Sequence, residues 1–296
     1  MTTAVIHQVP ATIASPEKTK PKKLKGAEVG IPVRKMGLTY GDDMPTFWLG
    51  GNAFLTLLFS AFSANLPEGE DQFVYSVRLF QDKITDPVLK AQVRAFIGQE
   101  AHHSREHEGL NEAMLKRGYR LDRIENRMKT MNKWMRKYQT PAQQLAGTVC
   151  GEHITALMAD FALRNPGLLL DITPDPVRTT WAWHSIEELE HKGVAFDVYD
   201  QLVGDRQLLQ RTMRVMLVFF VGQNILNALQ MMPRTGQMTN WKMWREAFGT
   251  LRAMVRFSRA DYRDFFKPDY HPWQHDCRDT LNAARQQYLN EPAVSA

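Results

Sequence analysis

Two Glu-x-x-His motifs are the residues of this sequence best suited to do chemistry. They are Glu100–His103 and Glu188–His191, in a chain of 296 residues that contains only nine histidines. In a helix, a spacing of three residues places both side chains on one face, one turn apart. Each pair can therefore bind one metal ion, and its carboxylate can bridge to a second ion.

Two further glutamates are placed to complete such a site. Glu152 interrupts an otherwise apolar stretch, where a carboxylate is costly to bury unless it is paired or bound to metal. Glu70 is the fourth candidate, because an apolar stripe continues its side of a predicted helix. Glu68 is its competitor, but Glu68 lies beside Pro67 and fits better as a negative charge at a helix N-terminus.

The order of these residues is one glutamate and then Glu-x-x-His, repeated once. This repeat is typical of a pseudo-twofold four-helix bundle that binds two metal ions. Four carboxylates neutralise most of the charge of two ions, and imidazoles leave positions open for O2 or water. His184 lies four residues before Glu188 on the same face and is a candidate third imidazole. The predicted metal ligands are Glu70, Glu100, His103, Glu152, His184, Glu188 and His191.

The other titratable groups receive simpler interpretations. We expect His102, His107 and His153 to lie at the surface or behind the ligands. Asp160 is either a hydrogen-bond partner of a ligand histidine or a plain surface acid. The polar and aromatic segment 269–275 is predicted to pack as a cap over a helix end.

Helical patterning runs through almost the whole chain from Pro45 onward. Strand signals are scarce, so the sequence predicts an all-α fold, a four-helix bundle with additional helices. Thr140 before Pro141 is a strong helix start. The predicted helical segments are 46–65, 68–82, 87–117, 122–138, 141–164, 175–203, 206–232 and 241–266. The chain divides into a basic flexible tail (1–40), a helical metal-binding domain (41–275) and a C-terminal extension (276–296).

The charge distribution and the composition limit the kinds of partner and the location that we expect for this protein. The net charge is +5, and the stretch 17–35, with seven basic and two acidic residues, accounts for all of it. A solvated basic arm explains this better than nucleic-acid binding, which we exclude; contact of the arm with phosphate or anionic lipid is the alternative. Two cysteines and no signal sequence favour a cytoplasmic chain. The apolar segments 46–65 and 213–232 are interpreted as buried helices, with peripheral membrane contact as the alternative.

Several motifs together resemble a bacterial family labelled "predicted metal-dependent hydrolase". They run from Ile31-Pro32-Val33-Arg34 through Leu66-Pro67-Glu68-Gly69-Glu70 and Gln99-Glu100-Ala101-His102-His103 to His184-Ser185-Ile186-Glu187-Glu188-Leu189-Glu190-His191. The resemblance covers about residues 30–275. In metal pattern the chain is similar to ferritin-like di-iron N-oxygenases of the p-aminobenzoate N-oxygenase type, which use four glutamates and three histidines. That similarity implies a ferritin-like bundle and a third histidine at the place of His184.

Three functions follow from these patterns. The first is a di-iron oxygenase or oxidase that activates O2 to oxidise a small, apolar or aromatic organic substrate. Its electrons would come from an external donor or reductase, because the sequence contains no dinucleotide fingerprint. The alternative is a metal-dependent hydrolase that uses a metal-bound hydroxide. A non-enzymatic metal-binding bundle is the third. We expect two iron ions, with manganese as the other metal that oxygen and nitrogen ligands suit; a homodimer stays open.

Overall fold

A computed structural model describes residues 24–291, and its secondary structure is helical apart from one isolated bridge between Leu49 and Ile172. The predicted all-α class is confirmed, whereas the finer likeness to a ferritin bundle stays a prediction. Residues 1–23 of the predicted tail and 292–296 of the C-terminal extension lie outside the described residues.

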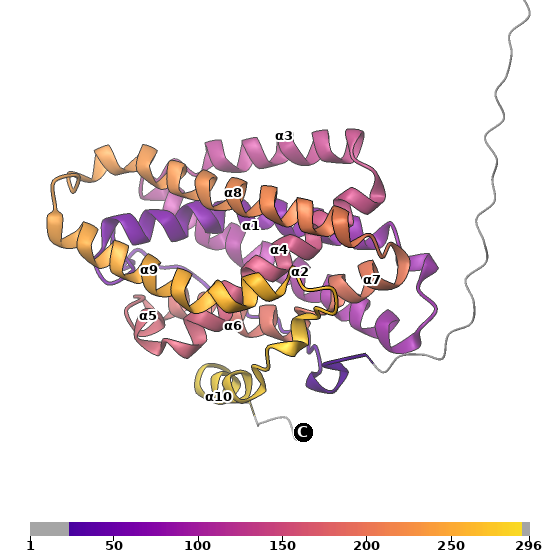
Figure 1. Ribbon diagram of the computed structural model, residues 1–296. Coiled ribbons are helices and arrows are strands. Elements are labelled where there is room, and N and C mark those ends of the chain that lie inside the picture. Colours follow the sequence, from indigo (N-terminus) through magenta and orange to yellow (C-terminus); the bar gives the residue numbers. More distant parts are fainter. Residues whose placement is uncertain (1–23, 292–296) are drawn as a thin grey trace, which may run out of the picture.

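Four helices form the central bundle (Figure 1). These are α1 (Ala53–Arg78), α2 (Pro87–Lys116), α4 (Pro141–Arg164) and α6 (Asp175–His191). Helix α1 packs against α2 and α4, and α6 packs against the same two helices. Each of the four carries at least one predicted metal ligand, so the bundle is the element that positions the candidate site.

The bundle interior has two apolar clusters with a polar layer between them. On α2, Leu89 to Phe96 belong to one cluster and Leu110 to Met114 to the other. Glu100 and His103 lie on the turns between these two stretches. On α4, Glu152 lies just before the change from one cluster (through Ile154) to the other (from Ala156). The apolar layers on both sides exclude water from the carboxylates, which raises the free energy of every unpaired charge there.

Further helices cover the bundle. They are α3 (Asp122–Tyr138), the short α5 (Pro166–Leu170), α7 (Val194–Leu202), α8 (Arg206–Met231), α9 (Trp241–Asp264) and α10 (Arg278–Leu289). Helices α8 and α9 run antiparallel across one side of the bundle, and α10 lies beneath α6 (Figure 1). Local caps support two of the predicted starts: Asp86 accepts hydrogen bonds from the amides of Val88 and Leu89, and Thr140 forms a capping box with Gln143.

The segments 46–65 and 68–82, predicted as separate helices, form the single helix α1, so this boundary was wrong. Pro67 lies inside the helix and cannot donate a hydrogen bond to the carbonyl one turn earlier. That carbonyl belongs to Ser63, and it accepts a hydrogen bond from the side-chain amide of Asn111 on α2 at 3.2 Å. A tertiary contact therefore replaces the lost backbone bond and lets the helix continue.

The predicted helix 175–203 is two helices, α6 and α7, with a turn at Lys192 and Gly193. At Gly193 an added Cβ would lie 2.9 Å from Nε1 of Trp273. The ammonium group of Lys192 lies 4.3 Å from the centre of the same ring and donates a hydrogen bond to the carbonyl of His275. The turn is thus fixed by the C-terminal segment that packs on it.

The expectation that 213–232 is a buried helix was wrong. Most residues of helix α8 are exposed or half-buried, and Val218 is 74% exposed. Among the described residues, only the stretch Arg206–Thr235 is long and apolar enough to cross a membrane, by length and composition alone. In the other apolar segment, by contrast, residues 53–57 and 60–66 are buried.

Residues assigned by sequence to the tail and the extension lie against the bundle. Leu24 and Val29 are buried, and Arg34 forms ion pairs with Glu187 of α6 and Glu291. Helix α10 packs against α4 and α6. Both ends of the described chain thus contact the helix that carries three of the predicted ligands.

A close approach of helices beside Glu152 gives a test of this packing. At Gly151 an added Cβ would lie 2.4 Å from Cζ of Phe73 on α1. We expect Gly151→Ala to lower the free energy of unfolding by about 1–3 kcal/mol, because the half-buried ring of Phe73, packed against the core, must move. Gly147→Ala on the same helix is the matched control, since its nearest neighbour is Cε of Met216 at 3.8 Å. Urea unfolding that finds the two variants equally stable would contradict the packing described here.

Candidate metal centre

The bundle brings all the predicted metal ligands together at its buried centre. Three overlapping groups of donor atoms each lie within 4.8 Å of one another. The groups are Glu100, Glu152 and His191; Glu100, His103 and Glu188; and Glu70, His103 and His184. Together they contain all seven predicted ligands, drawn from four helices. Their role as ligands stays a prediction, but their proximity is a property of the fold.

The grouping does not follow the two sequence motifs. Nε2 of His191 lies 3.1 Å from Glu100 and 3.2 Å from Glu152, but 3.8 Å from Glu188 of its own motif. Nδ1 of His103 lies about equally far from Glu100 (4.0 Å) and Glu188 (3.9 Å). The carboxylates of Glu100 and Glu188 therefore lie between the histidines and can bridge two ions.

Each of the three histidines has one ring nitrogen held by the protein and the other directed to the centre. His191 is the clearest case. The amide nitrogen of Gln99 donates to Glu190 and to the carbonyl of Pro32, so its oxygen accepts from Nδ1 of His191 at 2.9 Å. For His103, Nε2 donates to Glu187 at 3.0 Å. The remaining nitrogen of each neutral ring therefore presents a lone pair to the centre.

A chain of hydrogen bonds sets the same orientation for His184. The hydroxyl of Ser63 donates to Asn111, so it can only accept from Nδ1 of His107. Nε2 of His107 is then an acceptor, and Nδ1 of His184 donates to it at 2.9 Å. Nε2 of His184 is left with its lone pair, 3.0 Å from Glu188. All three tautomers are those that a metal ion requires.

The atoms that face the centre lack hydrogen-bond partners within the described chain. They are both carboxylate oxygens of Glu100 and of Glu152, Oε1 of Glu70, Nδ1 of His103, and Nε2 of His184 and His191. Buried polar atoms are almost always satisfied, so a cluster of unsatisfied acceptors calls for a cation. The residues present thus fit a pair of metal ions.

Glu70, and not its competitor Glu68, belongs to this cluster. Glu70 is buried, and one of its oxygens accepts a hydrogen bond from Ser104 at 2.8 Å. Glu68 instead accepts from Asn132 and lies 3.9 Å from the ammonium group of Lys129 on α3. The geometry therefore favours Glu70 as the donor from α1.

Behind the histidines lies a second layer of buried charge. The carboxylates of Glu187 and Glu190, which hold His103 and Gln99, are themselves paired with Arg34 at 2.9 and 2.7 Å. Arg285 of α10 donates to Glu190 at 2.6 Å. Two arginines from the ends of the chain thus neutralise the acids that orient the central histidines.

The pKa values of the acidic residues show how strongly the centre disfavours negative charge without a cation. Burial, reinforced by neighbouring carboxylates, raises the pKa of Glu70 and Glu100 well above the ordinary value. Burial also raises the pKa of Glu152, to about 7, despite attraction to His191. For Glu188, burial acts in the same direction, but the neighbouring imidazoles of His184 and His191 hold its pKa well below the usual range.

Two of the histidines respond in opposite ways. Burial and the neighbouring His184 lower the pKa of His103. Burial alone would also lower the pKa of His191, but Glu152 and the other carboxylates raise it well above the ordinary value. The carboxylates around His191 thus attract positive charge to the place that a metal ion would fill.

Sequence reasoning missed several residues that support the site. Arg34, Gln99, Glu187 and Glu190 stand in segments that carry the family resemblance but were given no role, and Arg285 gave no signal. His107 was expected at the surface or behind a ligand, and it lies buried behind His184.

The structure also places the other residues that the sequence analysis considered. His102 lies partly exposed beside Arg105, and His153 is buried against Tyr270. Asp160 pairs with Arg164 at 2.8 Å and is not a partner of a ligand histidine. In the segment 269–275, residues 270–273 are buried, as expected of a cap.

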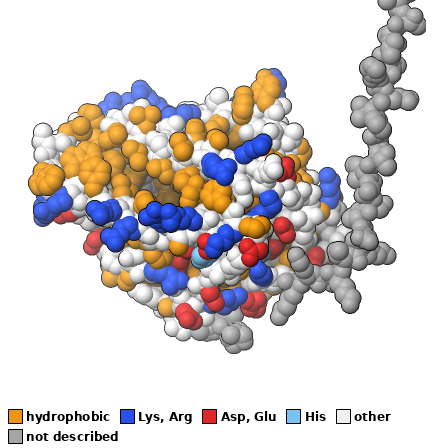
Figure 2. Space-filling view, in the orientation of Figure 1, with side chains coloured by type: hydrophobic (Ala, Val, Ile, Leu, Met, Phe, Trp, Pro, Cys, Tyr) orange, Lys and Arg blue, Asp and Glu red, His pale blue; other side chains and the backbone are white. Residues whose placement is uncertain are grey.

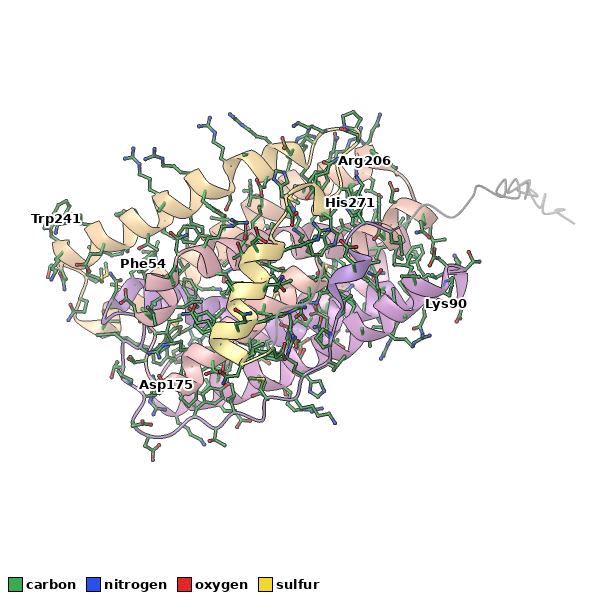
Figure 3. All side chains as sticks on the ribbon, turned by 90° about the horizontal axis from the view of Figure 1, so that it is seen from below. Phe54, Lys90, Asp175, Arg206, Trp241 and His271 are labelled. Carbon is green, nitrogen blue, oxygen red and sulfur yellow. The ribbon has the colours of Figure 1, made fainter. Side chains whose placement is uncertain are left out.

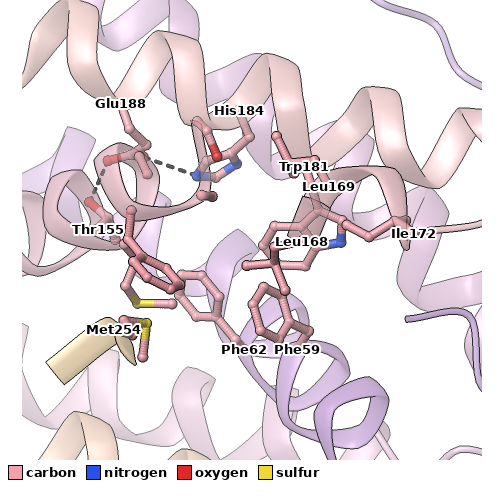
Figure 4. A pocket seen from close by; sticks show the side chains of 15 residues that line it. Phe59, Phe62, Thr155, Leu168, Leu169, Ile172, Trp181, His184, Glu188 and Met254 are labelled. Atoms are coloured by element: carbon pink, nitrogen blue, oxygen red, sulfur yellow. Dashed lines mark hydrogen bonds and ion pairs between the residues drawn. The ribbon is translucent and has the colours of Figure 1, made fainter. Parts of the chain in front are cut away.

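A cavity approaches the centre from one side (Figure 4). Its volume is about 30 Å³, and Glu188, His184 and Thr155 form its polar end. The hydroxyl of Thr155 donates a hydrogen bond to Glu188. The rest of the wall is apolar and aromatic, and it includes Phe59, Phe62, Leu168, Trp181 and Met254. A substrate on this path would meet the carboxylate end of the site through an apolar passage.

Comparison with known proteins gives one match. A family model described as "predicted metal-dependent hydrolase" matches residues 32–276. No curated protein and no solved structure matches significantly.

Loss of one central carboxylate should abolish the metal pair. We expect the wild-type protein to bind about two transition-metal ions per chain. Glu100→Gln should weaken binding roughly 100-fold or more, because Glu100 belongs to two of the three donor groups. Glu108→Gln, an exposed position on the same helix, is the control. Elemental analysis that finds normal metal content in Glu100→Gln would remove this residue from the site.

The raised pKa of Glu152 makes the stability of the metal-free protein depend on pH. Between pH 4.5 and about 7 the folded state keeps a proton that the unfolded state has lost, so stability falls as the pH rises through this window. In the presence of chelator, Glu152→Gln should therefore be more stable than wild type at pH 8, by up to roughly 3 kcal/mol. This difference should vanish near pH 4.5. A constant difference across pH, measured by urea unfolding, would show that Glu152 titrates normally.

Proposed function

This chain belongs to the predicted metal-dependent hydrolase family, and on that premise we propose that it is a metalloenzyme acting on an apolar substrate. The observation that carries the proposal is the cluster of unsatisfied, buried donor atoms at the end of an apolar cavity. Two metal ions would be held by the side chains of Glu70, Glu100, His103, Glu152, His184, Glu188 and His191.

Hydrolysis is the reaction that the family description favours, and we take it as the first candidate. A bound metal ion supplies a polarising charge and lowers the pKa of water. The chain contributes apolar and aromatic walls beside Glu188, against which the apolar part of an ester or amide would lie. Thr155 and Ser185 are the hydroxyl groups of its lining, and the Thr155 hydroxyl binds Glu188 and orients that carboxylate.

Oxidation of the substrate by O2 is the second candidate, and the donor set favours it. Four carboxylates and three imidazoles from a helical bundle suit iron or manganese and the shifting carboxylate modes of O2 chemistry. This reaction would need an external electron donor. The apolar cavity next to Glu188 argues for an enzyme of either kind over a non-enzymatic metal-binding bundle, which needs no passage for a substrate.

Turnover in the absence of oxygen separates the two reactions. If the chain is a hydrolase, metal-loaded protein should cleave p-nitrophenyl esters equally well under nitrogen and in air, and faster with longer acyl chains, because the cavity is apolar. Glu100→Gln should be inactive, and Glu108→Gln should retain activity. Failure to cleave any ester, together with O2 uptake by the iron-loaded protein, would favour the oxidative reaction.

A further inference from the structure

Helices α8 and α9 present an apolar face that no other described element covers. Val218 on α8 is 74% exposed, and Trp241 and Phe248 on α9 are 71% and 63% exposed. In Figure 2 hydrophobic side chains gather over these two helices, around a hollow between them. A contiguous apolar surface of this kind marks an interaction site.

Basic side chains line one edge of this face. Figure 2 shows a row of Lys and Arg side chains below the apolar patch, and in Figure 3 nitrogen-tipped side chains point outward along the helix that begins at Trp241. Arg245, Arg252, Arg256 and Arg259 are exposed and form no ion pair within the described chain. The segment 206–264 contains ten basic and three acidic residues, a net charge of +7 in a chain whose total is +5.

The hollow leads inward toward the candidate metal centre. It is a cavity of about 170 Å³ between α8 and α9, and Leu217, Val221, Leu251 and Val255 are in its wall. Deeper in, Phe59, Phe62 and Met158 line both this cavity and the smaller one that ends at Glu188 and His184. The two cavities thus share a wall, and apolar side chains alone separate the hollow from the cavity that ends at the site.

The inner side of α8 ties the helix to the bundle by polar contacts. Asn224 accepts a hydrogen bond from Asn65 of α1 at 3.1 Å, and Asn227 accepts one from Arg127 of α3 at 2.7 Å. The buried side of α8 combines these two amides with apolar residues of the core, Leu209, Met213, Ala228 and Met231. The helix is thus anchored to the bundle while its outer face stays apolar, an arrangement that suits a helix lying in a membrane interface.

We infer that the face formed by α8 and α9 docks on an anionic lipid bilayer. Its apolar side chains enter the headgroup boundary, and its unpaired arginines bind lipid phosphates and carboxylates. The hollow then opens toward the acyl chains. On the proposed function, the substrate is accordingly an apolar molecule dissolved in the membrane that reaches Glu188 without crossing water.

Flotation with lipid vesicles tests the docking. The full chain should bind phosphatidylcholine vesicles that contain about one third phosphatidylserine, and binding should weaken with salt and with removal of phosphatidylserine. Two double variants, Val218→Glu with Phe248→Glu and Arg252→Glu with Arg256→Glu, should each bind roughly tenfold or more weakly. Metal content, measured on the same samples, should stay at the wild-type level, because all four side chains are exposed.

Matched controls lie at the beginning of α2. Val88→Glu and the pair Lys90→Glu with Arg94→Glu change exposed apolar and basic residues there, and they should bind vesicles as wild type does. Absence of vesicle binding by wild type, or an equal loss in the controls, would overturn the inference. A wild-type dimer in ultracentrifugation that becomes a monomer in Val218→Glu with Phe248→Glu would also overturn it, because the face would then bind a second copy of the chain.

The rate of ester cleavage tests separately whether the substrate reaches the site from the membrane. A long-chain ester embedded in the vesicles should be cleaved more slowly by both double variants, and a short water-soluble ester at the wild-type rate. Equal rates on the embedded ester would overturn the delivery route. Failure of wild type on both esters would instead count against the proposed hydrolase, and the vesicle-binding result would stand by itself.

Discussion

The cost of burying four carboxylates inside a helical bundle is the constraint on which the rest of this structure depends. Glu70, Glu100, Glu152 and Glu188 lie in a layer from which water is excluded by apolar clusters on both sides. Such charges are tolerated only when a cation or a proton is shared among them. The raised pKa values of three of the four carboxyls, and of His191 between them, follow from that requirement.

The same constraint extends outward from the centre. Each central histidine is held by a hydrogen bond through its second ring nitrogen. His103 is held directly by the buried acid Glu187, and His191 is held by Gln99, which is bound to the buried acid Glu190. Those acids, Glu187 and Glu190, need arginines in turn, and Arg34 and Arg285 come from opposite ends of the described chain. The segments flanking the bundle therefore contribute to the electrostatics of the site as well as to its covering.

The two cavities lie between the polar candidate site and the apolar outer surface. The inner cavity ends at Glu188 and His184, whereas the outer one opens between α8 and α9, where apolar residues face outward. Helix α8 satisfies its own polar side chains on the inner face, through Asn224 and Asn227, and leaves an apolar outer face. The candidate metal centre is thus separated from the surface by apolar walls, which disfavour the entry of water.

The sequence by itself determined the all-α class and the set of donors, because helical periodicity and Glu-x-x-His spacing are local and place side chains on one face without knowledge of the rest of the fold. The helix starts that follow Asp86 and Thr140 could be predicted for the same reason. The continuation of α1 through Pro67, the burial of Arg34 and the exposed face of α8 were decided only by the tertiary structure. The first two features depend on a contact with residues far away in the chain, and the third depends on the lack of a covering element. A local sequence pattern contains neither kind of information.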